Sequence, residues 1–430
     1  MLWSDDSFRT GAGSHQSYVK CHTLFTGGCV STRPGSRPNH RPTATRGLSA
    51  ALAAALLLLL LVAPTADAAD SPSACALRGT TGWTDEGHDT DYSVFRRPVG
   101  TVKVGMLFVD FPDAPATEAP SEDSAQITAG ADWLWYASYG RTWLAIDQHQ
   151  RWVRMPRAST DYGFARGLTH ETHEAYVKDA VAAADPYVDF SGYDMVYVVP
   201  TRHAAAISFT PTYVYESGTA GVVADGRRVK WAVTFGQDMW HWGAKLVAHE
   251  TAHTFGLPDL YAFETGNDAH RFVGGWDVMG LIGGRGPQFF AWHSWKLGWT
   301  GDGQVVCRAT KGSDTVYLTA VEYGSGTKLA VIRTGPTTAY VVESRRGIQA
   351  DAGSCSTGAL VYRVDASVQT GQGPVRVMDA KPAAAPAGGC RPLDDALFWA
   401  GESFTDAAAG VRIDVLAADG YGETVRIAKS

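Results

Sequence analysis

The stretch VAHETAHTFGLPDLY, residues 247–261, predicts a helix that carries a metal site. It contains His249, Glu250 and His253 in the HExxH spacing. Residues four apart lie on one face of an α-helix, about 6 Å apart along its axis, so the two imidazoles can reach one ion. Glu250, one step round the helix, can hydrogen-bond a water held by that ion without being a ligand. The spacing therefore indicates a zinc site with its own general base.

The residues after this helix supply the expected third ligand. Gly256 tolerates the left-handed backbone of a helix C terminus, which allows the chain to turn sharply there. Asp259 is thereby brought to the ion from another direction. No glutamate is suitably placed for this role, because Glu264 follows His253 by only 11 residues and the next glutamate is far beyond it. The alternative third ligands are Asp277, His270 and His293.

A second turn, GGWDVMG at residues 274–280, contains a methionine that can lie below the metal. Met279 follows Asp259 by 20 residues, and we expect it to form the hydrophobic floor of the site, as in metzincin-type sites. Asp277 is expected to brace this turn if it is not itself a ligand. Tyr261 is either a second hydrogen-bond donor to the reacting carbonyl or an aromatic residue packed beside the turn.

The N-terminal region predicts a secreted protein. Residues 48–63 are almost all Ala and Leu, follow a basic flank and lead to the small-residue sequence ADA at 66–68. This pattern is typical of a secretory signal, so residues 1–68 are expected to be removed. The apolar run is shorter than the roughly 18 to 20 residues of a membrane span and ends at Pro64, which disfavours a membrane anchor.

The composition of the mature chain excludes some partners. It carries 31 Lys and Arg against 41 Asp and Glu, a net charge near −10. An acidic surface without basic clusters argues against nucleic acid and anionic membranes as partners. We expect a monomer that acts on extended polypeptide substrates.

Four cysteines are left in the mature chain. In an oxidising compartment an even number predicts two disulfides, and we favour Cys75 with Cys307 and Cys355 with Cys390. The alternative is that Cys75, near the new N terminus, binds the zinc and keeps the protein latent.

The catalytic region is expected to span residues 99–300, after an irregular lead-in at 69–98. Near-continuous apolar runs are typical of buried strands, and runs with a period of 3.6 are typical of helices. These patterns predict strands at 102–111, 143–152, 194–200, 212–215 and 229–235, a loop at 112–124, and helices at 127–139 and 168–184.

Two further features concern the helices. Asp238 is expected to cap the active-site helix, whose stripe of Trp240 and three alanines, Ala244, Ala248 and Ala252, packs on the sheet. The sequence HETHE at 170–174 resembles a ligand motif only superficially, because its charges and spacing are typical of a solvated helix face.

From residue 301 to 430 the pattern changes to short apolar runs separated by glycine-rich turns, which predicts an antiparallel β-rich region. This region either completes the catalytic domain by packing against it, which we favour, or forms an independent binding module. The runs are VYLTAV at 316–321, KLAVIR at 328–333, AYVVES at 339–344, ALVYRV at 359–364, VRIDVL at 411–416 and TVRIAK at 424–429.

The motifs HETAHTFGLPDLY, GGWDVMG and FFAWHSWKLGW together resemble those of the immune inhibitor A-like secreted metallopeptidases. The likeness extends more loosely over most of residues 102–430. It implies a zinc-dependent endopeptidase with a metzincin-like fold, often assisted by structural calcium. The looser matches are VGMLFVDFPD at 104–113, YVVESR at 340–345, GALVYRVD at 358–365 and GESFTD at 401–406.

We therefore expect an α+β protein with a zincin- or metzincin-like catalytic domain, followed by the β-rich region. The domain should hold a twisted mixed sheet, an active-site helix and a backing helix. His249, His253 and Asp259 are expected to bind Zn²⁺, and Glu250 to take a proton from the zinc-bound water that attacks a peptide bond. The alternatives are a zinc amidase acting on cell-wall peptides and an inactive secreted binding protein, against which the intact Glu250 argues.

Overall fold

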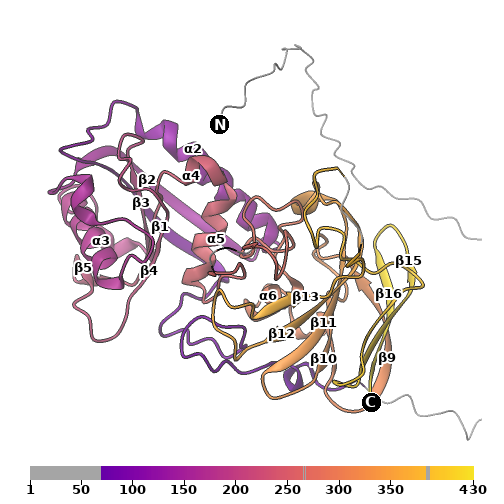
Figure 1. The fold of residues 1–430 in the computed structure, drawn as a ribbon. Helices are drawn as coiled ribbons and strands as arrows, with labels where there is room; N and C mark the ends of the chain where they lie inside the picture. The colour runs from indigo at the N-terminus through magenta and orange to yellow at the C-terminus, as the bar shows by residue number, and fades with distance from the viewer. Residues whose placement is uncertain (1–68, 265, 267, 384–387) are drawn as a thin grey trace, which may run out of the picture. The chain divides into compact units, whose positions relative to one another are not determined.

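The structure, a computed structural model, describes residues 69–430 apart from 265, 267 and 384–387. The expected secretory signal, residues 1–68, lies outside this part of the chain. Ala66–Ser430 form one compact unit, in which a mixed sheet with its helices is followed by two further β-sheets. The class is therefore α+β (Figure 1). None of the helices in the described part combines the length and the apolarity that a membrane span requires.

The first sheet contains five strands in the order β2-β1-β3-β7-β4. All neighbours are parallel except β4, which runs antiparallel to β7 and forms one edge of the sheet. Each strand lies within about two residues of its predicted position. The bounds are Gly100–Asp110 for β1, Thr142–Arg154 for β2, Met195–Pro200 for β3, Thr212–Val214 for β4 and Trp231–Thr234 for β7.

Helices cover both faces of this sheet, and the interior strand β1 is correspondingly apolar on both sides (Figure 1). Met106 and Phe108 of β1 share a core with helices α2, Pro120–Ala137, and α5, Lys245–Thr254. Leu107 and Val109 point to the opposite face and share a second core with α3, His170–Ala184. The helix α5 therefore lies against the sheet with α2 beside it.

The approach of α2 to α5 requires a glycine. A Cβ at Gly130 of α2 would collide with the backbone oxygen of Ala244 and the side chain of Val247. The absence of a side chain at Gly130 therefore lets the two helices pack backbone to backbone, which fixes α5 on the sheet.

Both predicted helices are present, but where they begin was predicted wrongly. Helix α2 begins at Pro120, so the predicted loop at 112–124 ends earlier than expected. Proline is favourable at the first helical position, because its nitrogen there needs no hydrogen-bonding partner. The predicted active-site helix is divided into α4, Met239–Trp242, and α5 by Gly243, which has a φ of +77°. Asp238 does not cap it, because its carboxylate accepts hydrogen bonds from Thr210 instead.

Trp240 is also not part of the buried stripe. Its side chain is 36% exposed and lies under the guanidinium of Arg202, whereas Ala248 and Ala252 are fully buried in the core as predicted.

The lead-in at 69–98 is irregular, as predicted, with one short 3-10 helix, Pro72–Ala74. It is nevertheless packed against the rest of the unit. Arg96 donates its backbone N–H to the carbonyl of Thr254 at the end of α5. Cys75 forms a disulfide with Cys307, and this bond contradicts the idea that Cys75 binds a metal.

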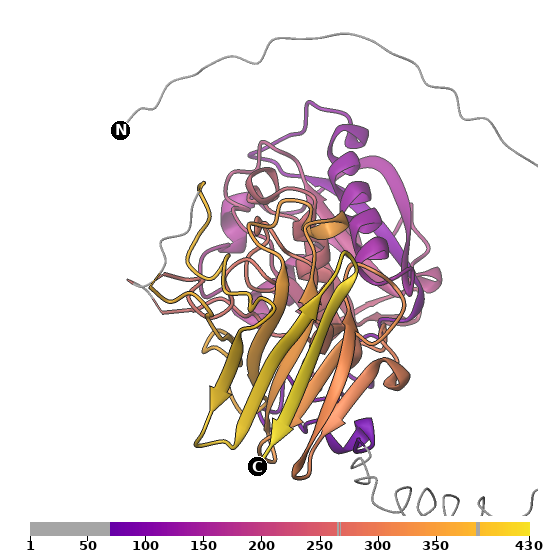
Figure 2. The ribbon, with the colours of Figure 1, turned by 90° about the vertical axis from the view of Figure 1, so that its right-hand side faces the viewer.

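The C-terminal region contains two sheets, in the orders β13-β12-β11-β10-β8 and β14-β15-β16-β9 (Figure 2). All six predicted runs form strands, and the pairing is antiparallel except between β8 and β10. The bounds are Val305–Arg308 for β8, Gly312–Thr319 for β9, Leu329–Arg333 for β10, Thr338–Arg345 for β11, Gly358–Asp365 for β12, Val375–Val377 for β13, Ser403–Asp406 for β14, Val411–Ala418 for β15 and Gly422–Lys429 for β16. The remaining elements are the hairpin of β5, Val222–Ala224, with β6, Arg227–Val229, and helix α6, Ala291–Lys296.

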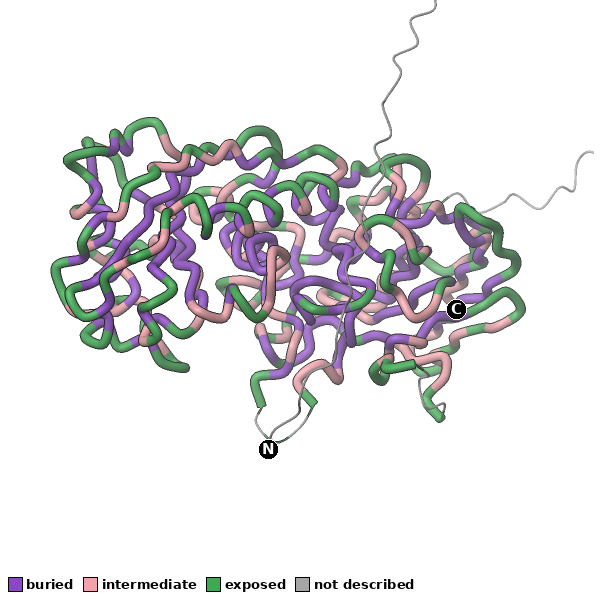
Figure 3. Tube along the Cα trace, turned by 90° about the horizontal axis from the view of Figure 1, so that it is seen from above, coloured by how far each residue is buried: buried purple, intermediate pink, exposed green. Residues whose placement is uncertain are grey.

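Strands β10, β11 and β12 of the first of these two sheets are buried on both faces. Figure 3 colours the buried segments of the chain purple. Val342 of β11 and Val361 of β12 face the second sheet in a sandwich core. Val341 and Leu360, their neighbours, point the other way and join the core that also contains Met106 and the helix α5. One continuous core therefore connects the predicted catalytic region with the C-terminal region. The second predicted disulfide, Cys355 with Cys390, is also present.

Candidate metal centre

The end of helix α5 has the geometry that the sequence predicted. Gly256 has a φ of +96°, in the left-handed region that glycine tolerates. Its N–H donates to the carbonyl of His253 at 3.0 Å, and the N–H of Leu257 donates to the carbonyl of Ala252 at 3.2 Å. This pair of bonds is a Schellman motif, and it turns the chain back so that Asp259 approaches the helix.

Three side-chain atoms meet at this turn. The Nε2 atoms of His249 and His253 are 3.3 Å apart, and each lies 3.3 Å from Oδ1 of Asp259. Ligands held tetrahedrally at the distances typical of zinc lie about 3.3 to 3.6 Å apart. The three atoms therefore have the spacing of one face of a zinc coordination tetrahedron.

The protonation of the two imidazoles supports this view. Nδ1 of His249 lies 2.9 Å from the carbonyl of Val278, and Nδ1 of His253 lies 2.8 Å from that of Leu257. A carbonyl only accepts, so in the neutral rings Nδ1 holds the proton and Nε2 presents a lone pair to the centre. Oδ1 of Asp259 is buried there and receives no hydrogen bond from the described residues. Three electron pairs converge, and a cation placed among them would satisfy all three.

The electrostatics of the site favour a positive charge. Burial alone would lower the pKa of His253, but the nearby carboxylate of Asp259 outweighs this effect and raises it to about 9. Burial would raise the pKa of Asp259, but the two histidines outweigh this effect and hold that pKa well below its usual range. A proton and a divalent cation therefore compete for the same position.

Glu250 lies next to this centre and is held by the edge strand β4. Thr212 of β4 has its hydroxyl 2.8 Å from both Oε2 and the backbone carbonyl of Glu250. Burial raises the pKa of Glu250, and the neighbouring histidines oppose that shift. The carboxylate is buried but is not one of the three converging groups, so its place fits a base beside the ion.

The turn at 276–279 is hydrogen-bonded to His249. The carbonyl of Val278 accepts the proton of His249, and the carbonyl of Met279 accepts the N–H of Leu260, next to Asp259. Met279 itself is fully buried in the core. One turn thus contacts both the first histidine and the segment that carries the carboxylate.

The alternative third ligands lie elsewhere. Asp277 braces the turn, with Oδ1 accepting from the N–H of Met279 at 2.7 Å and Oδ2 from that of Phe290 at 2.7 Å. His293 is buried between Asp277 and Glu86. His270 pairs with the carbonyl of Gly280. All three candidates are therefore engaged in structural contacts.

Two other predicted residues have clear surroundings. Tyr261 stacks on His249, with ring centroids 6.5 Å apart, and its ring lies tilted against that of Phe263, with centroids 5.4 Å apart. In the HETHE sequence, the prediction of a solvated face was wrong for His173, which is buried and hydrogen-bonded to Thr234 of β7.

Only one other group among the described residues has the spacing of metal ligands, and it consists of Cys355, Cys390 and Asp394. Its cysteines are joined in a disulfide, so they are not available to an ion. The calcium that the resemblance implies stays a prediction.

Sequence reasoning missed Thr212, Glu86 and the buried pair of Glu343 and Arg345. The sequence did contain one sign of the last two residues. They are opposite charges two positions apart, so they share one face of a strand, and that face is otherwise apolar. The comparisons with known proteins add nothing to the site, because no protein-family model matches the sequence and no curated protein is significantly similar to it.

Proposed function

We propose that this protein is a secreted zinc-dependent endopeptidase with a metzincin-like catalytic domain at 99–300, of the immune inhibitor A-like type. The observation that carries the proposal is the triangle of His249, His253 and Asp259, with Glu250 beside it. The mixed sheet with its antiparallel edge strand, the paired helices α5 and α2, and the buried Met279 in the turn at 276–279 all support this assignment.

The protein groups have separate roles in the proposed reaction. His249, His253 and Asp259 hold the ion, which when bound polarises a peptide carbonyl and acidifies water. The carboxylate of Glu250 accepts one proton from the attacking water and returns it to the leaving amine. Thr212 fixes the carboxylate through its hydrogen bond, so that it need not reorient during the reaction.

The edge strand β4 offers a place for the substrate. It pairs with β7 on one side and ends the order of strands in the described sheet. Its Thr212 contacts Glu250, so a peptide that pairs with β4 passes the reacting groups. We therefore propose that extended polypeptides bind here by strand addition.

A digestion experiment tests this function. The mature chain should cleave an unfolded protein, a chelator should abolish cleavage, and added Zn²⁺ should restore it. Glu250→Gln should bind one zinc per chain and lose about a thousandfold or more in rate, because it removes the general base but no ligand.

Three results would argue against the proposal. Full activity in Glu250→Gln would exclude the mechanism. Cleavage of cell-wall peptides without cleavage of proteins would point to an amidase. Zinc binding without any hydrolysis in the parent chain would point to a binding protein.

A further inference from the structure

We propose that Arg345, on strand β11 of the C-terminal region, is a positioning residue for the metal centre. It holds the turn at 276–279, and this turn orients His249. The inference rests on the proposed function, since it assumes that the histidine binds a metal. It gives the C-terminal region a defined part in the site.

Arg345 is fully buried and binds three separate segments. Its Nη2 donates to the carbonyl of Trp276 at 2.9 Å. Its Nη1 donates to the carbonyl of Gln288 at 3.0 Å and to Asp351 at 2.8 Å, and its Nε donates to Glu343 at 2.6 Å. The donors of the guanidinium are thus divided between two carboxylates and two backbone carbonyls of the catalytic region.

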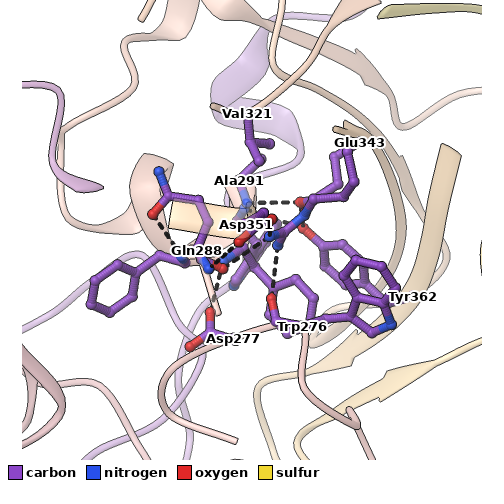
Figure 4. Close-up of polar contacts among 12 residues, drawn as sticks. Trp276, Asp277, Gln288, Ala291, Val321, Glu343, Asp351 and Tyr362 are labelled. Atoms are coloured by element: carbon purple, nitrogen blue, oxygen red, sulfur yellow. Dashed lines mark hydrogen bonds and ion pairs between the residues drawn. The ribbon is translucent and has the colours of Figure 1, made fainter. Parts of the chain in front are cut away.

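The two carboxylates that bind Arg345, those of Glu343 and Asp351, form further hydrogen bonds to the catalytic region. Oε2 of Glu343 accepts the N–H of Ala291, the first residue of α6, and the hydroxyl of Tyr362. Asp351 accepts the N–H of Gln288. Figure 4 shows Glu343, Asp351 and Tyr362 gathered with Trp276 and Ala291 in this buried network.

The network is connected to the metal centre through the backbone of residues 276–278. Trp276 is held by Arg345, and its neighbour Asp277 is held by the N–H of Phe290. Between them and Met279 lies Val278, whose carbonyl accepts the Nδ1 proton of His249. That hydrogen bond sets the tautomer and the direction of the ligand, as partners of metal-bound histidines do.

Stability alone does not explain this arrangement. A buried ion pair often contributes little net free energy compared with apolar residues of similar volume. The guanidinium does, however, fix the positions of segments that are far apart in sequence, since Arg345 and Trp276 are 69 residues apart. Positional accuracy at the turn is what a metal ligand requires.

Zinc affinity tests the proposal without measuring hydrolysis. Arg345→Lys keeps the buried charge but cannot bond all three segments at once. We expect its Kd for zinc, measured by competition with a chromophoric chelator, to rise about tenfold, the lower end of the loss seen when the direct partner of a metal-bound histidine is removed, because Arg345 acts through the turn. A role in stability alone would lower the free energy of unfolding and leave this Kd unchanged.

Arg308 provides the matched control. It is also buried, and its two short bonds to Asp314 join strands β8 and β9 within the C-terminal region. Arg308→Lys should therefore keep the parent Kd within twofold. If Arg345→Lys does not fold, Asp351→Asn takes its place, because it loosens Arg345 and should weaken zinc binding about threefold.

The outcomes separate the two proposals. An unchanged Kd in Arg345→Lys, or in Asp351→Asn where the first variant does not fold, or an equal rise in Arg308→Lys, would overturn the positioning role alone. A parent chain that binds zinc no more tightly than its His249→Ala variant would overturn the proposed function and the positioning role with it.

Discussion

At the scale of single residues, the site is defined by how close three electron-pair donors lie. Nε2 of His249, Nε2 of His253 and Oδ1 of Asp259 form a triangle with edges of 3.3 Å. Converging acceptors repel one another, and the chain brings them together through a helix, a left-handed glycine and a backbone carbonyl for each imidazole. The local structure therefore holds them in place, ready for a cation.

His293 makes a prediction about pH. Burial would lower its pKa, but Glu86 and Asp277 raise it to about 10, against 6.5 for a free histidine. Its contribution to stability is therefore complete below pH 6.5 and is lost as the pH rises through 10. Between these values it should decrease the free energy of unfolding by about 1.4 kcal/mol per pH unit.

Urea unfolding at pH 7, 8 and 9, with chelator present throughout, measures this slope. The slope of His293→Gln should be smaller by this amount, because His253, whose pKa is also raised, contributes equally in both proteins. The variant should also be less stable than the parent at pH 7. Equal slopes in the two proteins would show that His293 is not protonated in the folded state.

The sequence predicted those site residues whose positions follow from local geometry. His249, Glu250 and His253 share one helix, and Asp259 is placed by the turn at Gly256. The partners of His293 could not be predicted in the same way, because Glu86 lies 207 residues away. The hydrogen bond from Arg345 to the carbonyl of Trp276 could not be predicted either, because no local sequence pattern indicates which distant segments are in contact.

At the scale of elements, the relation between β4 and α5 is the most informative. The predicted strand and helix are both present, but the helix begins later than expected. Gly243 breaks it, and Asp238 bonds to Thr210 rather than to the helix. Whether a carboxylate caps a helix depends on the other donors near it in the fold. A favourable residue in the sequence therefore does not determine where the helix begins.

Thr212 of β4 carries a prediction for activity. Thr212→Val keeps the shape and the strand propensity but removes the hydroxyl that bonds Glu250. We expect kcat/KM to fall about tenfold or more, because a hydrogen bond to a buried charge contributes roughly 1.5 to 3 kcal/mol. The zinc Kd should not change, since Thr212 does not contact a ligand.

Thr234→Val serves as the control for this variant. Thr234 is a buried threonine of the adjacent strand β7, and its hydroxyl bonds His173 on the opposite face. The Thr234→Val variant should therefore have a lower free energy of unfolding but an unchanged kcat/KM. Equal losses of activity in both variants would mean that Thr212 acts only through the fold.

At the scale of the whole molecule, the central feature is the core shared by the two regions. Strand β11 contributes Val341 to the core of α5 and Val342 to the sandwich. The disulfide of Cys75 with Cys307 also joins the lead-in to strand β8. The sequence predicted both regions and favoured packing between them, but the charged network of Arg345 inside that contact could not be foreseen.

A truncated chain of residues 69–298 tests this dependence. It would expose the apolar face of α6 and leave the turn at 276–279 without Arg345, so it should be insoluble or lack a cooperative unfolding transition. Near-UV circular dichroism and thermal unfolding measure this directly. A soluble truncated chain with parent zinc affinity would show that the C-terminal region is a separate module.

The most direct test of the metal centre is anomalous diffraction at the zinc edge, from crystals of the mature chain grown with equimolar Zn²⁺. The account predicts one strong peak between Nε2 of His249, Nε2 of His253 and Oδ1 of Asp259, at about 2.0 to 2.2 Å from each. A map with no peak at this position, or with zinc bound only elsewhere on the chain, would contradict it.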